Sequence, residues 1–113
     1  MSSPHGAPSR AAEVAQLGGL NTADPGNGLV IPIAILGGTC ILTVAGAGET
    51  RKIDTPANAG FYFFVSNQGG SGDDVTLLSE ASATVANISD NETFLCYFDG
   101  TIWVSAKLIG NAT

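Results

Sequence analysis

The chain has 113 residues, of which 44% are hydrophobic and only 12% charged, and its net charge is −6. This length supports one domain, and the apolar content is too high for a disordered protein. The four basic residues form at most one adjacent pair, so nucleic-acid binding through phosphate neutralisation is not expected. So little charge on a lone domain indicates that another chain covers part of its surface.

Residues 1–28 are dominated by Pro, Gly, Ser and Ala, and their only apolar periodicity lies in residues 11–17. Two helical turns ended by Gly18 and Gly19 are marginal in water. We therefore predict a flexible N-terminal arm over residues 1–28, which is either a disordered terminus or a segment that orders on a partner surface. The start resembles no secretory signal and no apolar run is long enough to span a bilayer, so we expect a cytosolic site of synthesis.

From Leu29 onward, short apolar or alternating runs are separated by Gly, Asn, Asp and Pro, which predicts a β domain over residues 29–113. No helix-length segment is available to connect parallel strands, so the prediction is an all-β, antiparallel sandwich or barrel. Cys40 and Cys96 are expected to be buried thiols rather than a disulfide. About eight strands are predicted: 29–36, 39–45, 49–54, 60–66, 74–79, 83–88, 92–98 and 101–109.

Asp99-Gly100 lies between two strand-like runs and predicts a two-residue hairpin turn of type I′. Alternation along these strands places Phe94, Cys96, Phe98 and Trp103 on one face. The register set by this turn pairs the following residues: Phe98 with Thr101, Tyr97 with Ile102, Cys96 with Trp103, and Leu95 with Val104.

Both faces of this hairpin are apolar, and the run from Gly60 to Val65 repeats the feature. Strands that are apolar on both sides lie between two layers, and a chain this short has few layers to offer. The chain's own loops and arm could cover the second face, but a second copy is the preferred interpretation. The predicted self-association surface consists of Tyr62, Phe64, Leu95, Tyr97, Ile102 and Val104.

The inventory of catalytic groups is nearly empty. His5, the single histidine, lies in the arm and is far from both cysteines, so neither a nucleophilic pair nor a zinc site is expected. Asp54-Thr55-Pro56 lacks the glycine that follows the Asp-Thr of aspartic proteases. The Gly-rich segment 67–74 is interpreted as a hairpin loop rather than a phosphate or calcium site. We therefore predict no enzyme activity, cofactor or metal, while Tyr62, Tyr97 and Trp103 would form a sugar platform only if exposed and coplanar.

Two segments resemble a β module of tailed-phage virion proteins. One is the aromatic strand from Gly60 to Val65 with the Gly-rich turn and Val75-Thr-Leu77 after it, and the other is the closing Asp99-Gly-Thr-Ile-Trp103. The resemblance covers about residues 39–109, and small size and a distinct arm favour capsid decoration (cement) proteins within that group.

The resemblance implies a homotrimer on the outer surface of an icosahedral capsid, made in the bacterial host cytoplasm and tying neighbouring major capsid protein subunits together. The arm would then bind the capsid through Val14, Leu17 and Leu20. A receptor- or carbohydrate-binding tip module of a tail or head fibre is the alternative.

Overall fold

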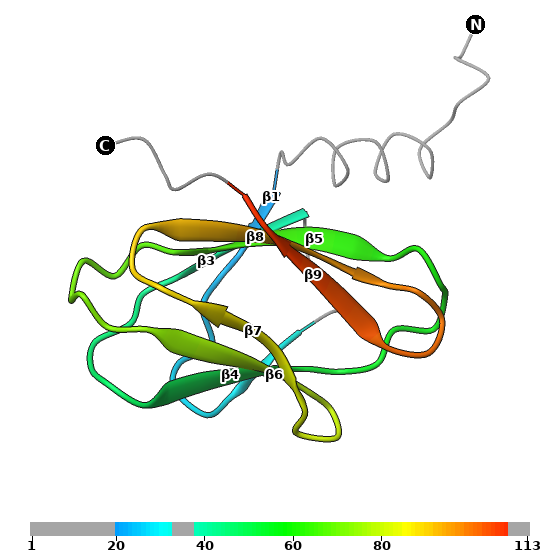
Figure 1. The fold of residues 1–113 in the computed structure, drawn as a ribbon, viewed down its shortest axis with the longest axis horizontal. Coiled ribbons are helices and arrows are strands. Elements are labelled where there is room, and N and C mark those ends of the chain that lie inside the picture. The colour runs from blue at the N-terminus through cyan, green and yellow to red at the C-terminus, as the bar shows by residue number, and fades with distance from the viewer. Residues whose placement is uncertain (1–19, 33–37, 109–113) are drawn as a thin grey trace, which may run out of the picture.

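A computed structural model describes residues 20–32 and 38–108, which form two β-sheets packed face to face (Figure 1). The five-stranded sheet has the order β1-β3-β5-β8-β9, and the four-stranded sheet has the order β2-β4-β6-β7. The all-β sandwich predicted from alternation is therefore confirmed. The strands are β1 (Leu20–Thr22), β2 (Val30–Ile31), β3 (Gly38–Leu42), β4 (Glu49–Ile53), β5 (Tyr62–Asn67), β6 (Val75–Ser79), β7 (Thr84–Ile88), β8 (Glu92–Phe98) and β9 (Trp103–Lys107).

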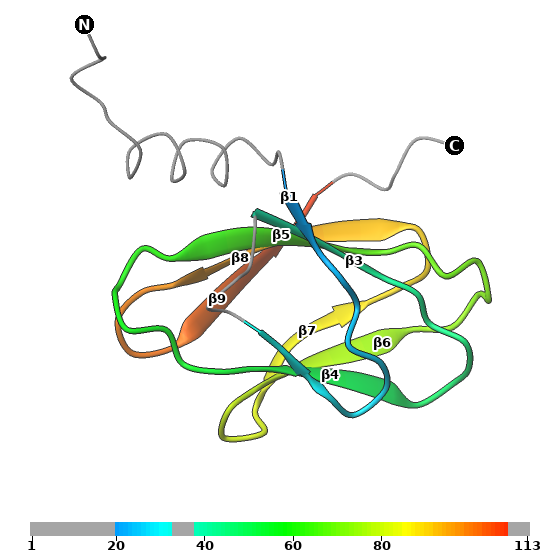
Figure 2. The same cartoon turned by 180° about the vertical axis from the view of Figure 1, so that it is seen from behind.

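The sheets are mixed, so the prediction of purely antiparallel pairing was wrong. Strand pairs β1–β3, β3–β5, β2–β4 and β4–β6 are parallel, whereas β5–β8, β6–β7 and β8–β9 are antiparallel. From β1 to β6 the chain alternates between the two sheets, and Figure 2 shows β1, β3 and β5 side by side. A strand in the opposite sheet thus makes the crossover for which a helix is usually needed.

The hairpin at Asp99 has a register two residues away from the predicted one. Phe98 pairs with Trp103, and residues 99–102 form a four-residue loop. The Asp99 Oδ1 atom accepts hydrogen bonds from the backbone N–H groups of Thr101 and Ile102, at 2.8 and 2.9 Å, which stabilises this longer loop. Because the shift is an even number, it moves no strand residue to the opposite face, and the predicted face of Phe94, Cys96, Phe98 and Trp103 is retained.

Residues 20–28 belong to the sandwich rather than to a separate arm. Leu20 begins β1, which pairs in parallel with β3, and Asp24 forms a two-point ion pair with Arg51 of β4. The predicted arm residues Val14 and Leu17 lie outside the described residues, so their part in capsid binding stays a prediction.

The core lies between the sheets and contains both thiols. Cys40 and Cys96 are buried on the inner side of the five-stranded sheet, and neither is in a disulfide. They lie on β3 and β8 with β5 between them, so about 10 Å separates their strands, which is too far for a disulfide. The other fully buried apolar side chains include Ile31, Leu42, Val44, Ile53, Phe63, Val65, Val75, Leu77 and Ile88.

Candidate interaction surface

The outer surface of the five-stranded sheet is an uncharged and mainly apolar area, here called the apolar face. Its first row across the strands is Tyr62–Tyr97–Val104, and the second is Thr39–Phe64–Leu95–Ala106. A third row joins Ile41, Ser66 and Thr93. None of these ten outward positions on β3, β5, β8 and β9 carries a charge.

Several side chains of the apolar face are open to solvent. Ile41, Tyr62 and Tyr97 are 40%, 38% and 42% exposed, and Phe64 and Leu95 are half-buried. A hollow of about 320 Å³ crosses β3, β5 and β8 where Ile41, Phe64 and Thr93 line it. An uncharged area of this kind, hollowed and spread over four strands, is typical of a surface that contacts another macromolecule.

Five of the six side chains predicted for self-association lie together on the apolar face: Tyr62, Phe64, Leu95, Tyr97 and Val104. Ile102 does not, because the longer hairpin places it in the 99–102 loop, where it is 59% exposed. The sequence interpretation missed Ile41 and Ala106, although both alternate with inward-facing neighbours. The structure contains one chain, and self-association through these residues stays a prediction.

The outer surface of the four-stranded sheet is more polar. Its outward positions include Thr50 and Lys52 on β4, Thr76 on β6 and Asn87 on β7, and two apolar residues, Val30 of β2 and Leu78 of β6, flank Lys52. The Thr76 hydroxyl lies 2.7 Å from the Asn87 side-chain oxygen and donates to it, so these two groups also partner each other. This surface resembles the wet face expected of a small sandwich.

A buried cation joins the 23–28 segment to the four-stranded sheet. The Arg51 side chain is 1% exposed, and its guanidinium contacts both Asp24 oxygens, at 2.6 and 2.9 Å, and Glu49 Oε1 at 3.0 Å. Burial favours a higher pKa for Asp24, but hydrogen bonds from Arg51, Gly26 and Thr43 outweigh it and hold the pKa below its usual value. This network stabilises the fold and presents no open reactive group.

The Gly-rich segment 67–74 is an arch between the two sheets rather than a hairpin loop, because it connects β5 to β6. The backbone N–H groups of Gly70 and Gly72 donate to the Asp90 carboxylate at 3.1 and 3.2 Å. A Cβ on Gly69 would clash with the backbone of Val44, so this position requires glycine. The backbone amides that made the segment resemble an anion site therefore bind the Asp90 carboxylate of the same chain.

The three aromatic side chains considered for sugar binding do not share one surface. Tyr62 and Tyr97 point outward, whereas Trp103 points toward the core and packs edge-on against Phe61 and Phe63. Ring centroids of Trp103 and Phe63 are 5.6 Å apart. A coplanar platform of these three residues is therefore excluded.

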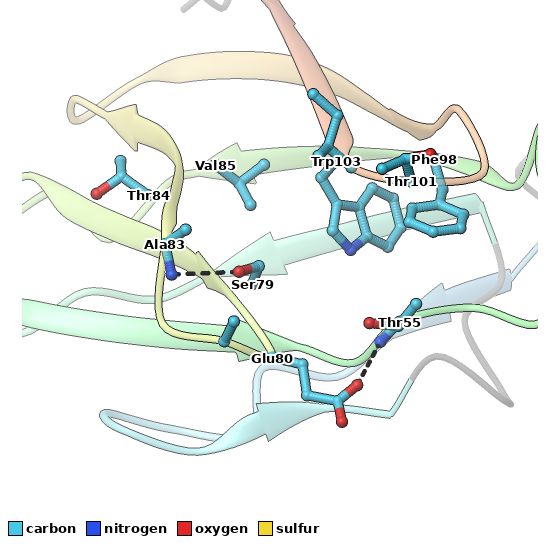
Figure 3. Close-up of a pocket in the computed structure, with 11 residues that line it drawn as sticks. Thr55, Ser79, Glu80, Ala83, Thr84, Val85, Phe98, Thr101 and Trp103 are labelled. Carbon is cyan, nitrogen blue, oxygen red and sulfur yellow. Dashed lines mark hydrogen bonds between the residues drawn. The ribbon is translucent and has the colours of Figure 1, made fainter.

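Trp103 instead borders a cavity of about 390 Å³ at one end of the sandwich (Figure 3). The β6–β7 turn and the 99–102 loop form its opposite walls, and Thr55 and Glu80 lie at one side. The Trp103 Nε1 atom is buried and has no hydrogen-bond partner among the described residues. Glu80 Oε1 accepts a 3.0 Å hydrogen bond from the Thr55 N–H, which holds the pKa of Glu80 below its usual value.

Within residues 20–32 and 38–108, no cluster of three or more His, Cys, Asp and Glu side chains could hold a metal ion. In the same ranges, no helix is long and apolar enough to cross a membrane. Burial raises the pKa of both Cys40 and Cys96 to about 12, so neither is a reactive thiolate at neutral pH. His5 lies outside the described residues.

Comparison with known proteins returned no match: no family model, curated protein or solved structure is similar to this chain at a significant level.

Proposed function

We propose that this chain is a non-catalytic structural protein that self-associates through the apolar face and binds the outer surface of an icosahedral phage capsid, where it cements neighbouring major capsid protein subunits. The single observation that carries the proposal is the uncharged, half-exposed outer surface of the five-stranded sheet. The resemblance of residues 39–109 to a phage virion module is the reason for proposing a capsid as the binding partner and a trimer as the assembly.

Self-association follows from the energetics of the apolar face. Covering apolar area stabilises a complex by about 25 cal/mol per Å², and aromatic side chains such as Tyr62 and Tyr97 contribute most of it at interfaces. Copies with a net charge of −6 repel one another, but the outward positions of β3, β5, β8 and β9 add no charge of their own to that repulsion. A homotrimer, each copy contacting two others, is the proposed assembly.

Capsid binding is assigned to residues 1–19, with Val14 and Leu17 as apolar contacts, together with Leu20 at the start of β1. Because β1 begins at Leu20, the segment before it can be removed without removing any strand of the described residues. A protein that binds only the assembled shell stabilises it by about 2.7 kcal/mol per site at a concentration 100 times the dissociation constant. Repetition over many sites makes a modest individual affinity sufficient.

Two measurements on one preparation test the proposal. Native mass spectrometry of the full chain should give a trimer, and co-sedimentation with empty capsid shells should show saturable binding. A chain of residues 20–113 should remain trimeric but bind shells more weakly. A monomer at high micromolar concentration would remove the self-association step, and unchanged shell binding by the shortened chain would remove the arm's role.

A receptor- or carbohydrate-binding tip module is the second candidate. The cavity beside Trp103 favours it, because this lining residue has a buried indole N–H without a hydrogen-bond partner among the described residues. Glycan-array binding by a protein that does not sediment with shells would favour this function over cementing.

A further inference from the structure

The cavity beside Trp103 has the composition of a small-molecule site. Its volume of about 390 Å³ lies toward the lower end of the range for ligand pockets, roughly 300–1,000 Å³. Val85, Phe98 and Ile102 give it apolar walls, and Thr55, Ser79 and Glu80 place polar groups at one side (Figure 3). An apolar body with a few convergent polar groups is the usual design of such sites.

Two polar groups at the cavity need different hydrogen-bond partners, one an acceptor and the other a donor. Trp103 Nε1–H is a donor without an acceptor among the described residues, and Figure 3 shows this nitrogen directed to the side where Thr55 and Glu80 lie. Glu80 is an ionised acceptor whose Oε1 atom already takes the Thr55 N–H. A ligand that satisfies both groups must both accept and donate hydrogen bonds.

Charge narrows the class of ligand. Glu80 is the one charged residue that lines the described cavity, and the whole chain carries −6, so anions are disfavoured. A simple cation could pair with Glu80 but has no acceptor for the indole N–H. Hydroxyl groups act as both donor and acceptor, and the C–H faces of a sugar ring match apolar walls such as Val85 and Ile102.

The indole nitrogen is fully buried, so it lies behind the cavity wall rather than on it. The β6–β7 turn lines the cavity with Ala81 and Ala83, and Ser82 between them has the strained backbone angle φ of 67°. The turn is closed by a 2.8 Å bond from the Ser79 N–H to the Ala83 carbonyl. A ligand hydroxyl reaches Nε1 only if the residues that cover this atom move aside.

From these observations we infer that the cavity between the β6–β7 turn and the 99–102 loop binds one residue of a neutral saccharide, with Trp103 Nε1–H donating to a ring hydroxyl and Glu80 accepting from another. The site differs from the predicted sugar platform, since Tyr62 and Tyr97 lie on the opposite side of the five-stranded sheet. It depends on neither self-association nor capsid binding, so it can hold or fail independently of both.

Trp103 is the single tryptophan of the chain, which makes the test specific to this cavity. The ¹⁵N-labelled full chain is titrated with D-glucose, D-galactose and N-acetyl-D-glucosamine, and the one indole N–H resonance is followed. N-acetylneuraminic acid serves as the anionic probe and an acetylated dipeptide amide as the peptide probe. We expect a saturable shift of the indole resonance with at least one neutral sugar and none with the acid.

Two variants separate the cavity from the rest of the surface. Ala83→Leu fills the cavity and should weaken sugar binding about tenfold or more, because it removes the contact volume. Ala47→Leu adds the same side chain at an exposed position of the β3–β4 loop, outside the cavity lining, and should leave binding unchanged. Glu80→Gln should weaken binding while preserving shape.

The following outcomes would overturn the inference: no saturable indole shift with any neutral sugar, equal binding by the Ala83→Leu and Ala47→Leu variants, or binding of the dipeptide amide alone. The wild-type titration decides the matter even if a variant fails to fold.

Discussion

The outer surfaces of the two sheets have the same local architecture but differ in polarity. Tyr62, Tyr97 and Ile41 project from the five-stranded sheet without a charge in the rows between them, whereas Thr50, Lys52 and Asn87 project from the four-stranded sheet. A sandwich needs only its inner faces to be apolar in order to fold. The difference therefore indicates that folding alone does not explain the composition of the five-stranded sheet, and it is the ground on which a contact through its outer surface is proposed.

The largest expected effect contrasts the two sides of a single strand in the four-stranded sheet. Arg51→Met leaves Asp24 and Glu49 as uncompensated, largely buried carboxylates, and we expect unfolding free energy to fall by about 3–5 kcal/mol. Lys52→Met, on the outer surface, should change it by less than about 0.5 kcal/mol. Urea denaturation of both variants measures the contrast, and equal losses would contradict it.

A second, smaller effect sets one outer surface against the other. Tyr97→Lys introduces a charge into the centre of the apolar face and should weaken self-association by about 2 kcal/mol, or roughly 30-fold. Asn87→Lys makes a matched change on the four-stranded sheet and should leave association unchanged. Sedimentation velocity over a concentration series gives both values. If the two variants associate equally well, the apolar face is not the interface.

Acid pH should lower the stability of the fold without any change in charge on the apolar face. The pKa of Asp24 is lowered in the folded state, as is the pKa of Glu49, whose carboxylate accepts the Ala45 N–H and a bond from Arg51. Their stabilisation is complete above the unfolded-state values of roughly 3.9 and 4.3, and is lost as pH falls through the lower folded values. Thermal denaturation should therefore shift to lower temperature below about pH 4, while association above that pH stays constant. A trimer that dissociates between pH 5 and 7 would contradict this.

The smallest effect concerns salt. An uncharged interface has no ion pairs to screen, and salt reduces the repulsion between copies that each carry −6. Raising the salt concentration from 0.05 to about 0.5 M should leave the dissociation constant unchanged or lower it slightly. Weaker association at high salt would indicate that charged groups outside the apolar face dominate the contact.

Much of the fold follows from local alternation, which is why the strands from β2 to β9 fall within or beside the predicted runs. Two features do not follow from it. β1 spans only Leu20–Thr22, too short for a period, and is held by its pairing with β3 and by the distant ion pair of Asp24 with Arg51. The parallel pairing depends on crossovers through the opposite sheet. The residue pattern of the two paired strands does not indicate such a crossover.

The candidate surface was predictable in part for the same reason. Side chains alternate between the two faces of a strand, which puts Tyr62 and Phe64 on one face of β5 and Leu95 and Tyr97 on one face of β8. An error of two residues in the hairpin register therefore left these residues on the same surface. Ile102 was misplaced because its position depends on loop length, which the Asp99 side chain determines. The cavity beside Trp103 depends on how two remote turns meet, and no local pattern encodes that.

The alternation of β1 to β6 between the two sheets has a mechanical consequence. In each sheet, the two strands of a parallel pair are separated along the chain by one strand of the other sheet. Neither layer can then peel away while the other stays intact, and the sandwich should lose its structure in one cooperative step. A force applied to one sheet is therefore transmitted to the other sheet through the connections between the strands.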